Sequence, residues 1–265
     1  MKILNKDVQS LTKEITEWLK NENLFDELPY TDLVLTFLEG CKYRTDVTKR
    51  KIKNYLEVRK TTPEWYENRD PSLLEIKRLL QLGVFLPLPH KDEENRYTIL
   101  VRATIHDPQT IPISHVYKIG MMVLDLLLAN DHDVSKNGVN VLIDLSGVSF
   151  GHVYQMTPFL VKKTVFLWQD CYPIRFKTLN FVNCPYFVGW LINLMKNFMT
   201  QKLKKRVKVH GSYDELHGVL DPSRLPEEYG GTDGKLEPIK DDWLERINSK
   251  KEWFLSDMKN VEELS

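Results

Sequence analysis

The 265-residue chain has only three cysteines, Cys41, Cys171 and Cys184, and none of them has the spacing of a CxxC motif or a metal site. An odd number of cysteines without a secretory signal is typical of reduced thiols in the cytosol. The first ten residues, MKILNKDVQS, contain no apolar stretch of the length that a signal peptide needs. We therefore expect a cytoplasmic protein.

The sequence also lacks a long hydrophobic run and an excess of charge of either sign. Its most apolar run, MMVLDLLLAN, is about half as long as a membrane span and contains Asp125. Lys and Arg number 37, as do Asp and Glu, which argues against a general nucleic-acid binder but leaves a local basic patch possible. No histidine or carboxylate spacing indicates a metal site, and no glycine-rich segment has the context of a phosphate loop. We expect neither metal nor cofactor.

Residues 1–88 predict a small helical unit. In DVQSLTKEITEWLK, Val8, Leu11, Ile15 and Trp18 recur at helical spacing. Three further segments have helix-capping or proline starts and polar connections between them. They are TDLVLTFLEGCKY, TDVTKRKIKNYLEVRK and PSLLEIKRLLQLG. The pattern predicts a bundle of four short helices.

Residues 89–235 alternate between strand-like and helix-like segments. YTILVRA and VNVLIDL are aliphatic runs of strand length, and the helix predicted between them, HVYKIGMMVLDLLLAND, is apolar on most sides. A later helical segment is predicted to break near Pro158, and RVKVHG predicts a last strand. This alternation predicts an α/β (α+β) fold with a partly parallel sheet. Residues 236–265 form a charged tail with Trp243, Trp253 and Phe254 as anchors.

The segment QDCYPIRFKTLNFVNCP places charged and apolar residues alternately. Arg175 and Lys177 alternate with Ile174 and Phe176. In an extended chain, alternate side chains point to opposite faces. The segment therefore predicts a strand with cations on one face and an apolar wall on the other.

The next segment, YFVGWLINLMKNFM, predicts a helix that is apolar almost all round. It is interpreted either as a buried core helix or as a helix with one face over an apolar cavity and the other able to touch lipid. KLKKRVK follows, with five basic residues in seven, and the spacing of Lys202 and Arg206 places them on one helix face. Such a run is often only a solvated surface, but near an anionic membrane each basic group contributes about 1 kcal/mol.

GVSFG, at residues 147–151, matches the nucleophile elbow of serine hydrolases and would make Ser149 a nucleophile. His210 and His217 lie downstream, as do Asp214 and Asp221. Three features argue against catalysis: the turn is not tight, no oxyanion segment precedes it, and these histidines lie beside a terminal strand. His152 is interpreted as a hydrogen-bonded structural residue.

Four segments, in this order, resemble the CRAL-TRIO, or Sec14-like, lipid-binding family. FLEGCKYRTDVTKRKIKNYLEVRKTTPEWY resembles its helical N-terminal module, and VLIDLSGVSFGHVYQMTP its central strand and loop. QDCYPIRFKTLNFVNCPYFVGWLINLMKNFMTQKLKKRVKVHG resembles its cavity wall, gate helix and basic helix, and LPEEYGG its closing segment. The resemblance implies a helical N-terminal domain (1–88), an α/β sandwich (89–235) over a closed hydrophobic pocket with a mobile gate helix, and a helical tail (236–265).

The resemblance also implies a function. Members of the family carry one apolar or lipid molecule between membranes or to an enzyme, and are not catalysts. We expect a monomer that binds a hydrophobic small molecule or lipid and associates reversibly with phosphoinositide membranes. The alternatives are a serine hydrolase using Ser149 and an adaptor that has lost its cavity but still binds phosphoinositides.

Finally, the resemblance implies site residues. Ile174 stands where phosphatidylinositol carriers have an acidic residue, which makes the chain similar to the tocopherol and retinaldehyde carriers. The phosphoinositide contacts of the tocopherol carriers fall on Arg175, Lys177, Lys202 and Arg206, whereas a further arginine falls on Cys41, so that contact is missing or comes from Lys42 or Arg44. The family's pocket wall falls on Ile143, Met156, Leu160, Thr164, Leu167, Trp168, Ile174, Phe187, Trp190, Leu191 and Leu194.

Overall fold

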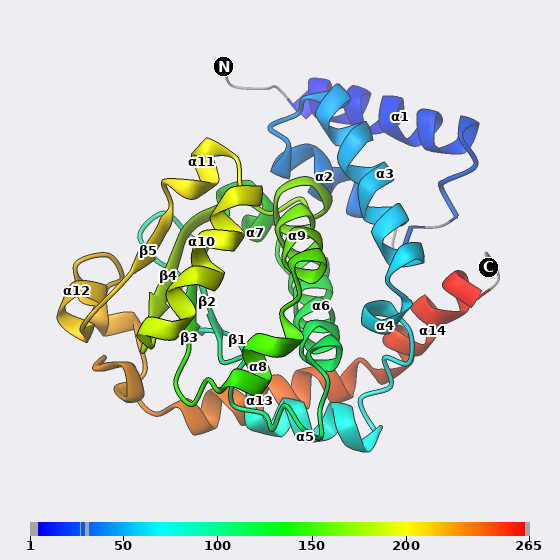
Figure 1. The fold of residues 1–265 in the computed structure, drawn as a ribbon. Helices are drawn as coiled ribbons and strands as arrows, with labels where there is room; N and C mark the ends of the chain where they lie inside the picture. Colours follow the sequence, from blue (N-terminus) through cyan, green and yellow to red (C-terminus); the bar gives the residue numbers. More distant parts are fainter. Residues whose placement is uncertain (1–4, 27, 30–31, 263–265) are drawn as a thin grey trace.

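The fold is a mixed five-stranded sheet surrounded by helices (Figure 1). The computed structural model describes residues 5–26, 28–29 and 32–262; residues 1–4 and 263–265 of the predicted first unit and tail lie outside the described residues. The strands are β1 (Phe85–Pro87), β2 (Tyr97–Val101), β3 (Val139–Asp144), β4 (Phe176–Val182) and β5 (Val207–Val209). They lie in this order, with β1 antiparallel to β2 and all other pairs parallel. The predicted α/β class and partly parallel sheet are confirmed.

The N-terminal helices are α1 (Asn5–Asn21), α2 (Leu33–Gly40), α3 (Thr45–Thr61), α4 (Pro63–Tyr66) and α5 (Leu74–Leu82). The fourth is a single turn that the sequence analysis did not predict, and it begins at Pro63, whose missing N–H costs nothing at a first helical position. Gly83 ends α5 in the left-handed region, at φ 68°. Strand β1 lies before residue 88 but pairs with β2, so part of the predicted helical unit belongs to the sheet. The domain boundary itself stays a prediction.

Helices of the second half cover the sheet and close its ends. The predicted break at Pro158 separates α8 from α9, where Thr157 caps α9 by accepting from the Leu160 N–H. The elements are α6 (Ile113–Asn130), α7 (Asp133–Asn137), α8 (Phe150–Gln155), α9 (Pro158–Phe166), the π-turn η1 (Leu167–Cys171), η2 (Tyr186–Val188), α10 (Gly189–Phe198), α11 (Gln201–Lys204), α12 (Tyr213–His217), η3 (Pro222–Arg224), η4 (Glu227–Tyr229), α13 (Leu236–Ser249) and α14 (Lys251–Glu262).

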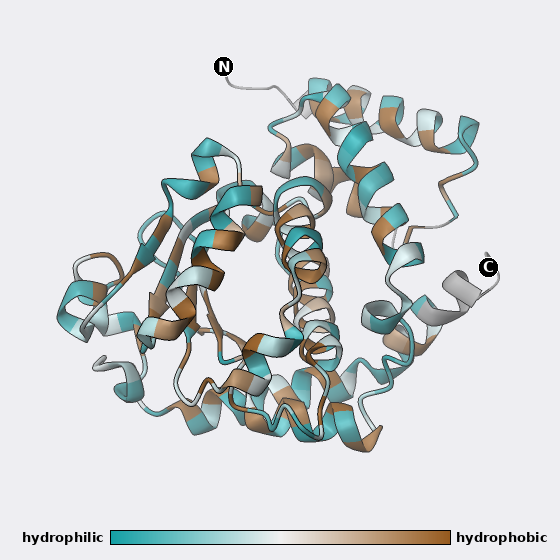
Figure 2. Cartoon of the chain, viewed as in Figure 1, coloured by the Kyte–Doolittle hydropathy of each residue, from teal (hydrophilic) through white to brown (hydrophobic). Residues whose placement is uncertain are grey.

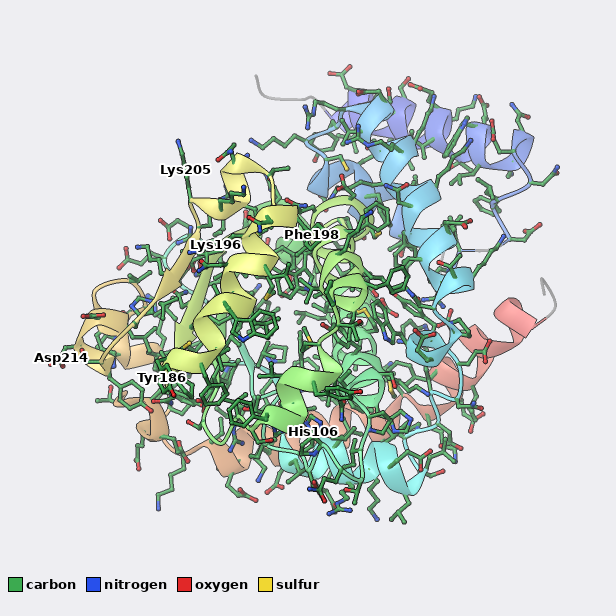
Figure 3. All side chains as sticks on the ribbon, viewed as in Figure 1. His106, Tyr186, Lys196, Phe198, Lys205 and Asp214 are labelled. Atoms are coloured by element: carbon green, nitrogen blue, oxygen red, sulfur yellow. The ribbon has the colours of Figure 1, made fainter. Side chains whose placement is uncertain are left out.

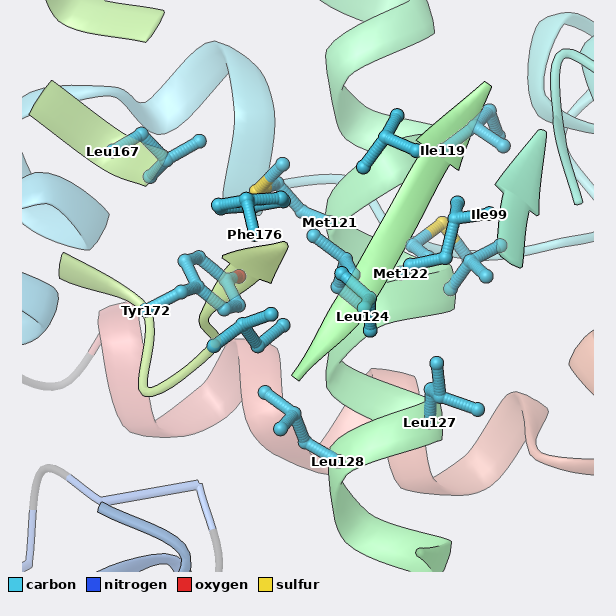
Figure 4. Close-up of a cluster of buried hydrophobic side chains, with 14 of the residues drawn as sticks. Ile99, Ile119, Met121, Met122, Leu124, Leu127, Leu128, Leu167, Tyr172 and Phe176 are labelled. Carbon is cyan, nitrogen blue, oxygen red and sulfur yellow. The ribbon is translucent and has the colours of Figure 1, made fainter. Parts of the chain in front are cut away.

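Helix α6 runs through the core, as its apolar circumference predicts. Figure 4 shows its Met121 and Leu124 near Ile99 of β2 and Phe176 of β4. Among the described residues, α6 is also the one helix long and apolar enough to cross a membrane. Because 67% of that 18-residue window is buried inside the protein, its apolar surface already packs against protein.

A buried ion network joins the two ends of the chain to the core. Arg59 of α3 and Arg69 each donate to Asp257 of α14 across 2.7 Å, and Arg69 also donates to Asp125 of α6 across 2.7 Å. All four side chains are at most 4% exposed. The hydroxyl of Tyr172 donates to Asp125 across 2.8 Å, which holds the turn that leads into Arg175 and β4. The tail is thereby tied to both the N-terminal helices and the sheet.

Candidate functional site

An apolar cavity lies against one face of the sheet. Its volume is about 170 Å³. A cavity that holds one water molecule needs only about 10–15 Å³, so this cavity can hold a much larger molecule. Alternate residues of three strands form its floor, because side chains two apart share a face. They are Ile99 and Val101 of β2, Val141 and Ile143 of β3, and Leu179 and Phe181 of β4.

Helices form the other walls of the cavity. Helix α6 contributes Val116, Tyr117 and Met121 among others, and α10 contributes Leu191, Ile192 and Met195. Val153 of α8, Thr164 of α9 and Trp168 of η1 are also among the lining residues. No Lys, Arg, Asp or Glu is among the lining residues, all of which belong to the part of the chain that the structure describes. The cavity therefore suits an uncharged, largely apolar molecule.

The structure places the eleven residues of the expected pocket wall in two groups. Those that line the cavity are Ile143, Met156, Thr164, Trp168 and Leu191. Those that are not among its lining residues are Leu160, Leu167, Ile174, Phe187, Trp190 and Leu194. Leu167 and Ile174 are buried in the core, at 0% and 2% exposure, and Trp190 is 53% exposed. Whether a ligand contacts any of the eleven stays a prediction.

The sequence analysis assigned none of the α6 residues to the pocket. Its circumference is apolar on most sides, so the pattern predicts burial without showing which side faces an empty space. The strand residues of the cavity floor could have been predicted from the sequence. The period-2 alternation places Val141 with Ile143, and Leu179 with Phe181, on the same face of their strands.

Helix α10 separates the cavity from the outer surface. Leu191, Ile192 and Met195 face the cavity while Trp190 is half exposed, so the structure fits the interpretation of one face over a cavity better than that of a wholly buried core helix. In Figure 2, hydrophobic residues occur along much of α10, whereas α11 is mainly hydrophilic.

Large aromatic side chains are exposed on α8, on α9 and around the start of α10. Tyr186 is 97% exposed and lies at the lower end of α10 in Figure 3. The Phe150 ring of α8 stacks on the Phe187 ring with centroids 4.8 Å apart. The exposed aromatic surface consists of Phe150, Tyr154, Phe159, Tyr186 and Trp190. Single exposed apolar residues are ordinary, but a group of exposed aromatic side chains is typical of a contact surface.

Three of the four expected phosphoinositide-binding residues lie close together at the outer end of β4. The Arg206 guanidinium donates to the carbonyl oxygen of Phe176 across 2.5 Å, beside Arg175 and Lys177. Burial lowers the pKa of Arg175, and nearby Arg206 lowers it further. Burial also lowers the pKa of Lys177, together with the charges of Arg175 and Arg206 among its neighbours. None of these cations has an ion pair with a carboxylate among the described residues.

The predicted helical face shared by Lys202 and Arg206 is wrong. Helix α11 ends at Lys204, and Arg206 lies in the turn before β5. The physical reason is the pairing of β5 with β4, in which the Leu179 N–H donates to the Arg206 carbonyl across 2.9 Å. The pairing of β5 with β4 brings Arg206 close enough to Arg175 for its charge to lower the pKa of Arg175. Lys202 lies exposed on α11.

The position implied for a further arginine, Cys41, is buried at 3% exposure and cannot present a charge. The adjacent Lys42 is exposed, and its charge is among those that lower the pKa of Lys177. Arg44 instead donates to the Cys41 carbonyl. Of the two replacements considered, Lys42 is the one whose charge acts on the cluster.

Ser149 caps α8 and hydrogen-bonds His152. Its Oγ lies 2.9 Å from His152 Nδ1, and His152 Nε2 lies 3.0 Å from the His106 carbonyl oxygen. The structural role expected for His152 fits this capping box. The histidines suggested as partners of Ser149 bond elsewhere: His210 to Asn180 and His217 to the Tyr229 carbonyl, each across 3.0 Å. Within the described residues, no group of three or more His, Cys, Asp or Glu could hold a metal ion.

Comparison with known proteins identifies the family. Residues 82–231 match the model of the CRAL/TRIO domain, and residues 4–76 match the model described as Pinta-like, UBA domain. The chain belongs to the CRAL/TRIO family, as its resemblance to the CRAL-TRIO lipid-binding proteins indicated.

Several relatives are similar over most of the chain. The human protein named alpha-tocopherol transfer protein-like is 32% identical over 88% of this chain and 66% of its own length. Mouse Clavesin-1 is 28% identical over 87% of this chain and 64% of its own length. The chain thus spans slightly less than two thirds of these relatives. The crystal structure of Sfh5 superposes with a TM-score of 0.59 at 19% identity, covering 88% of this chain and 90% of that one, which shows the same fold.

Proposed function

We propose that the chain is a carrier that binds one hydrophobic molecule in the cavity and exchanges it at phosphoinositide-containing membranes. The observation that supports this best is a cavity of molecular size with no charged lining residue. Burial of apolar ligand surface there is favourable by about 25 cal/mol per Å². The name of the relative, alpha-tocopherol transfer protein-like, makes tocopherol the first candidate ligand. The proposal places the protein in the cytoplasm, as a monomer, and assigns it no catalytic step.

Exchange requires a path out of the cavity, and we assign it to α10. This helix has cavity residues on one side and the half-exposed Trp190 on the other, so its movement would open the cavity beside the exposed aromatic surface. Aromatic rings with one apolar and one wet side are favourable at the membrane interface. Contact with a bilayer would then place the opening against lipid, so that the ligand need not cross water.

We assign phosphate binding to the basic cluster, defined as Arg175, Lys177 and Arg206 together with Lys42, whose charge acts on Lys177. Lys202, exposed on α11, is proposed as a further contact. Cations that already repel one another and lack carboxylate partners gain most from a polyanionic head group. At an anionic leaflet each contributes about 1 kcal/mol, enough for reversible binding and too little for permanent anchoring.

The two sites can be coupled through β4. Phe176 lines the cavity while its carbonyl oxygen accepts from Arg206 in the basic cluster. A phosphoinositide that draws Arg206 away from this carbonyl would bias the cavity wall and α10 toward an open state. The shift can be no larger than the difference in the lipid's affinity for the two states.

Native mass spectrometry of the freshly purified protein, followed by organic extraction, tests the carrier proposal. We expect a stoichiometric bound mass of a few hundred daltons that is lost on extraction. An empty protein that also stays empty after incubation with mixed lipids would contradict it and favour the adaptor interpretation.

Liposome sedimentation tests the membrane part. In the double variant Arg175→Glu/Lys177→Glu we expect binding to phosphoinositide liposomes to be lost while ligand loading is retained. The matched control is Lys77→Glu/Arg78→Glu, which makes the same charge change on exposed positions of α5. Equal binding of both double variants to phosphoinositide liposomes would contradict a role of the basic cluster in membrane binding.

A further inference from the structure

Helix α10 is joined to α11 by a link of only two residues. These residues, Met199 and Thr200, are extended, with ψ angles of 146° and 154°. A few residues between two rigid elements are the usual place of a hinge. The last carbonyl groups of one helix and the first N–H groups of the next have no partner within their own helix. The partners of these backbone groups therefore decide how freely α10 moves against α11.

One side chain, Gln169, bonds to both sides of this link. Its Nε2 donates to the Phe198 carbonyl oxygen across 3.3 Å, and its Oε1 accepts from the Thr200 N–H across 2.6 Å. Neither backbone group has another hydrogen-bond partner among the described residues. Because the donor and the acceptor of the amide are both used, its orientation is fixed. We call these two hydrogen bonds the Gln169 clamp.

The clamp is built on the π-turn η1. In such a turn an N–H bonds the carbonyl five residues back, and here the Tyr172 N–H donates to the Leu167 carbonyl across 3.2 Å. Within this turn Trp168 lines the cavity, whereas the next residue, Gln169, bonds the end of α10. Single π-turns are frequent at functional sites. The turn thus connects the cavity wall with the link between α10 and α11.

Helix α3 of the N-terminal helices bonds the same π-turn. Asn54 Nδ2 donates to the Asp170 carbonyl across 3.0 Å, and Lys51 Nζ donates to the Tyr172 carbonyl across 2.8 Å. Asp170 directly follows Gln169 in the chain. A displacement of α3 therefore acts on the residue next to the clamp.

We propose that the N-terminal helices control the movement of α10 through Gln169, a positioning residue that holds the link between α10 and α11. The inference rests on the proposed carrier function, in which α10 opens the cavity. Lys42 of the basic cluster lies just before α3, so an anionic head group can act on the same helix. Its effect on the clamp can be no larger than the difference in its affinity for the two positions of α3.

Hydrogen exchange of the purified chain, read by mass spectrometry, measures this movement without any ligand. In Gln169→Ala we expect the amides of residues 193–198 to exchange about 5-fold faster or more, the usual effect of losing at least one net hydrogen bond. The control Gln201→Ala removes an exposed amide beside the clamp and should leave this exchange unchanged. A Gln169→Ala protein that melts cooperatively and exchanges like the unaltered chain overturns the inference.

A second variant keeps the test valid if the alanine variant does not fold. Gln169→Glu retains the side-chain length and the acceptor for the Thr200 N–H, but its carboxylate cannot donate to the Phe198 carbonyl. We expect faster exchange in α10 and unchanged exchange in α9. Exchange that rises equally in both helices would indicate a general loss of stability and would overturn the positioning role.

The control by α3 has its own measurement. Asn54→Ala removes a bond from α3 to the π-turn, and we expect α10 to exchange about 2- to 10-fold faster although Asn54 does not contact it. Glu57→Ala, at an exposed position one turn further along α3, is the control. Because residues that act through one another are not additive, Asn54→Ala should add nothing in the Gln169→Ala protein. Fully additive effects, or no effect of Asn54→Ala, overturn the role of α3.

The outcome for the clamp is independent of the outcome for the carrier proposal, which native mass spectrometry decides. Faster exchange of α10 in a protein that never loads a hydrophobic molecule would contradict the carrier proposal and support the clamp. Unchanged exchange in the Gln169 variants of a protein that carries a ligand would contradict the clamp alone.

Discussion

The Phe150 ring stacks on the Phe187 ring at a centroid distance of 4.8 Å, and this contact joins α8 to the turn that begins α10. Phe150 is nevertheless 75% exposed. The stack therefore contacts the start of α10 from the surface of the protein. We expect this contact to stabilise the position of α10, the helix that we assign to ligand exit, and we call the Phe150–Phe187 stack the latch.

Loss of this latch should speed ligand exchange. For Phe150→Ala we expect the release rate of a bound fluorescent ligand to rise about 2- to 10-fold, because an aromatic pair contributes about 0.5–1.5 kcal/mol beyond buried area. The measurement is transfer to acceptor liposomes followed by stopped-flow fluorescence. Leu74→Ala is the control, since Leu74 is 79% exposed on α5 and lies outside the exposed aromatic surface. Equal rates for both variants would contradict the latch.

A second prediction concerns the residue that replaces the missing arginine contact. The charge of Lys42 is among those that lower the pKa of Lys177. Arg44 instead donates a hydrogen bond to the Cys41 carbonyl oxygen. For Lys42→Glu we expect phosphoinositide-liposome affinity to fall about 5- to 30-fold, since reversal removes one attraction of about 1 kcal/mol and adds a similar repulsion. The variant Arg44→Glu should lower the affinity for phosphoinositide liposomes clearly less than Lys42→Glu does. If Arg44→Glu is the more harmful, the assignment must move to Arg44.

Much of the fold could be predicted from local pattern. The aliphatic runs that became β2 and β3, the buried α6 and the break at Pro158 all follow from periodicity and proline chemistry acting over a few residues. The alternation predicted Phe176 on the apolar face, but Leu179, three positions later, lines the same cavity because the pairing register shifts at the start of β4.

The rest depended on contacts between distant residues. The turn at Arg206 is fixed by β5 pairing with β4, and a basic run of that composition reads equally well as a helix. The hydrogen bond between the Tyr117 and Thr164 hydroxyls joins two residues that are 47 positions apart in sequence. No spacing rule connects Arg59 with Asp257, which are 198 residues apart. Local patterns specify elements, whereas the polar groups of a cavity emerge only when those elements pack.

A third prediction tests the tie between the tail and the core. Asp257→Ala removes the buried carboxylate that Arg59 and Arg69 share, and removing one partner of a buried ion pair costs about 3–5 kcal/mol. We expect a loss of that size in the free energy of unfolding measured with urea. The control Asp242→Ala breaks an exposed pair with Arg246 on α13 and should cost at most about 1 kcal/mol. Similar losses for the two variants would show that the network does not join the tail to the core.

The last prediction concerns acid sensitivity near the cavity. Burial lowers the pKa of His106 from its ordinary value of 6.5, and the neighbouring His152, whose ring centroid is 4.9 Å away, lowers it further; Asp107 acts in the opposite direction. Burial likewise lowers the pKa of His115 and His210.

A histidine with a lowered folded-state pKa binds fewer protons when folded than when unfolded over the interval between the two pKa values. The free energy of unfolding must therefore decrease as the pH falls below about 6.5, by at most about 1.4 kcal/mol per pH unit for each group. Urea denaturation between pH 7.5 and 5.5 measures this slope. His106→Gln, which cannot take up a proton, should reduce the slope, whereas His90→Gln, at an exposed histidine, should leave the histidine-dependent loss in place. A slope that is unchanged in His106→Gln would show that His106 does not resist protonation in the folded protein.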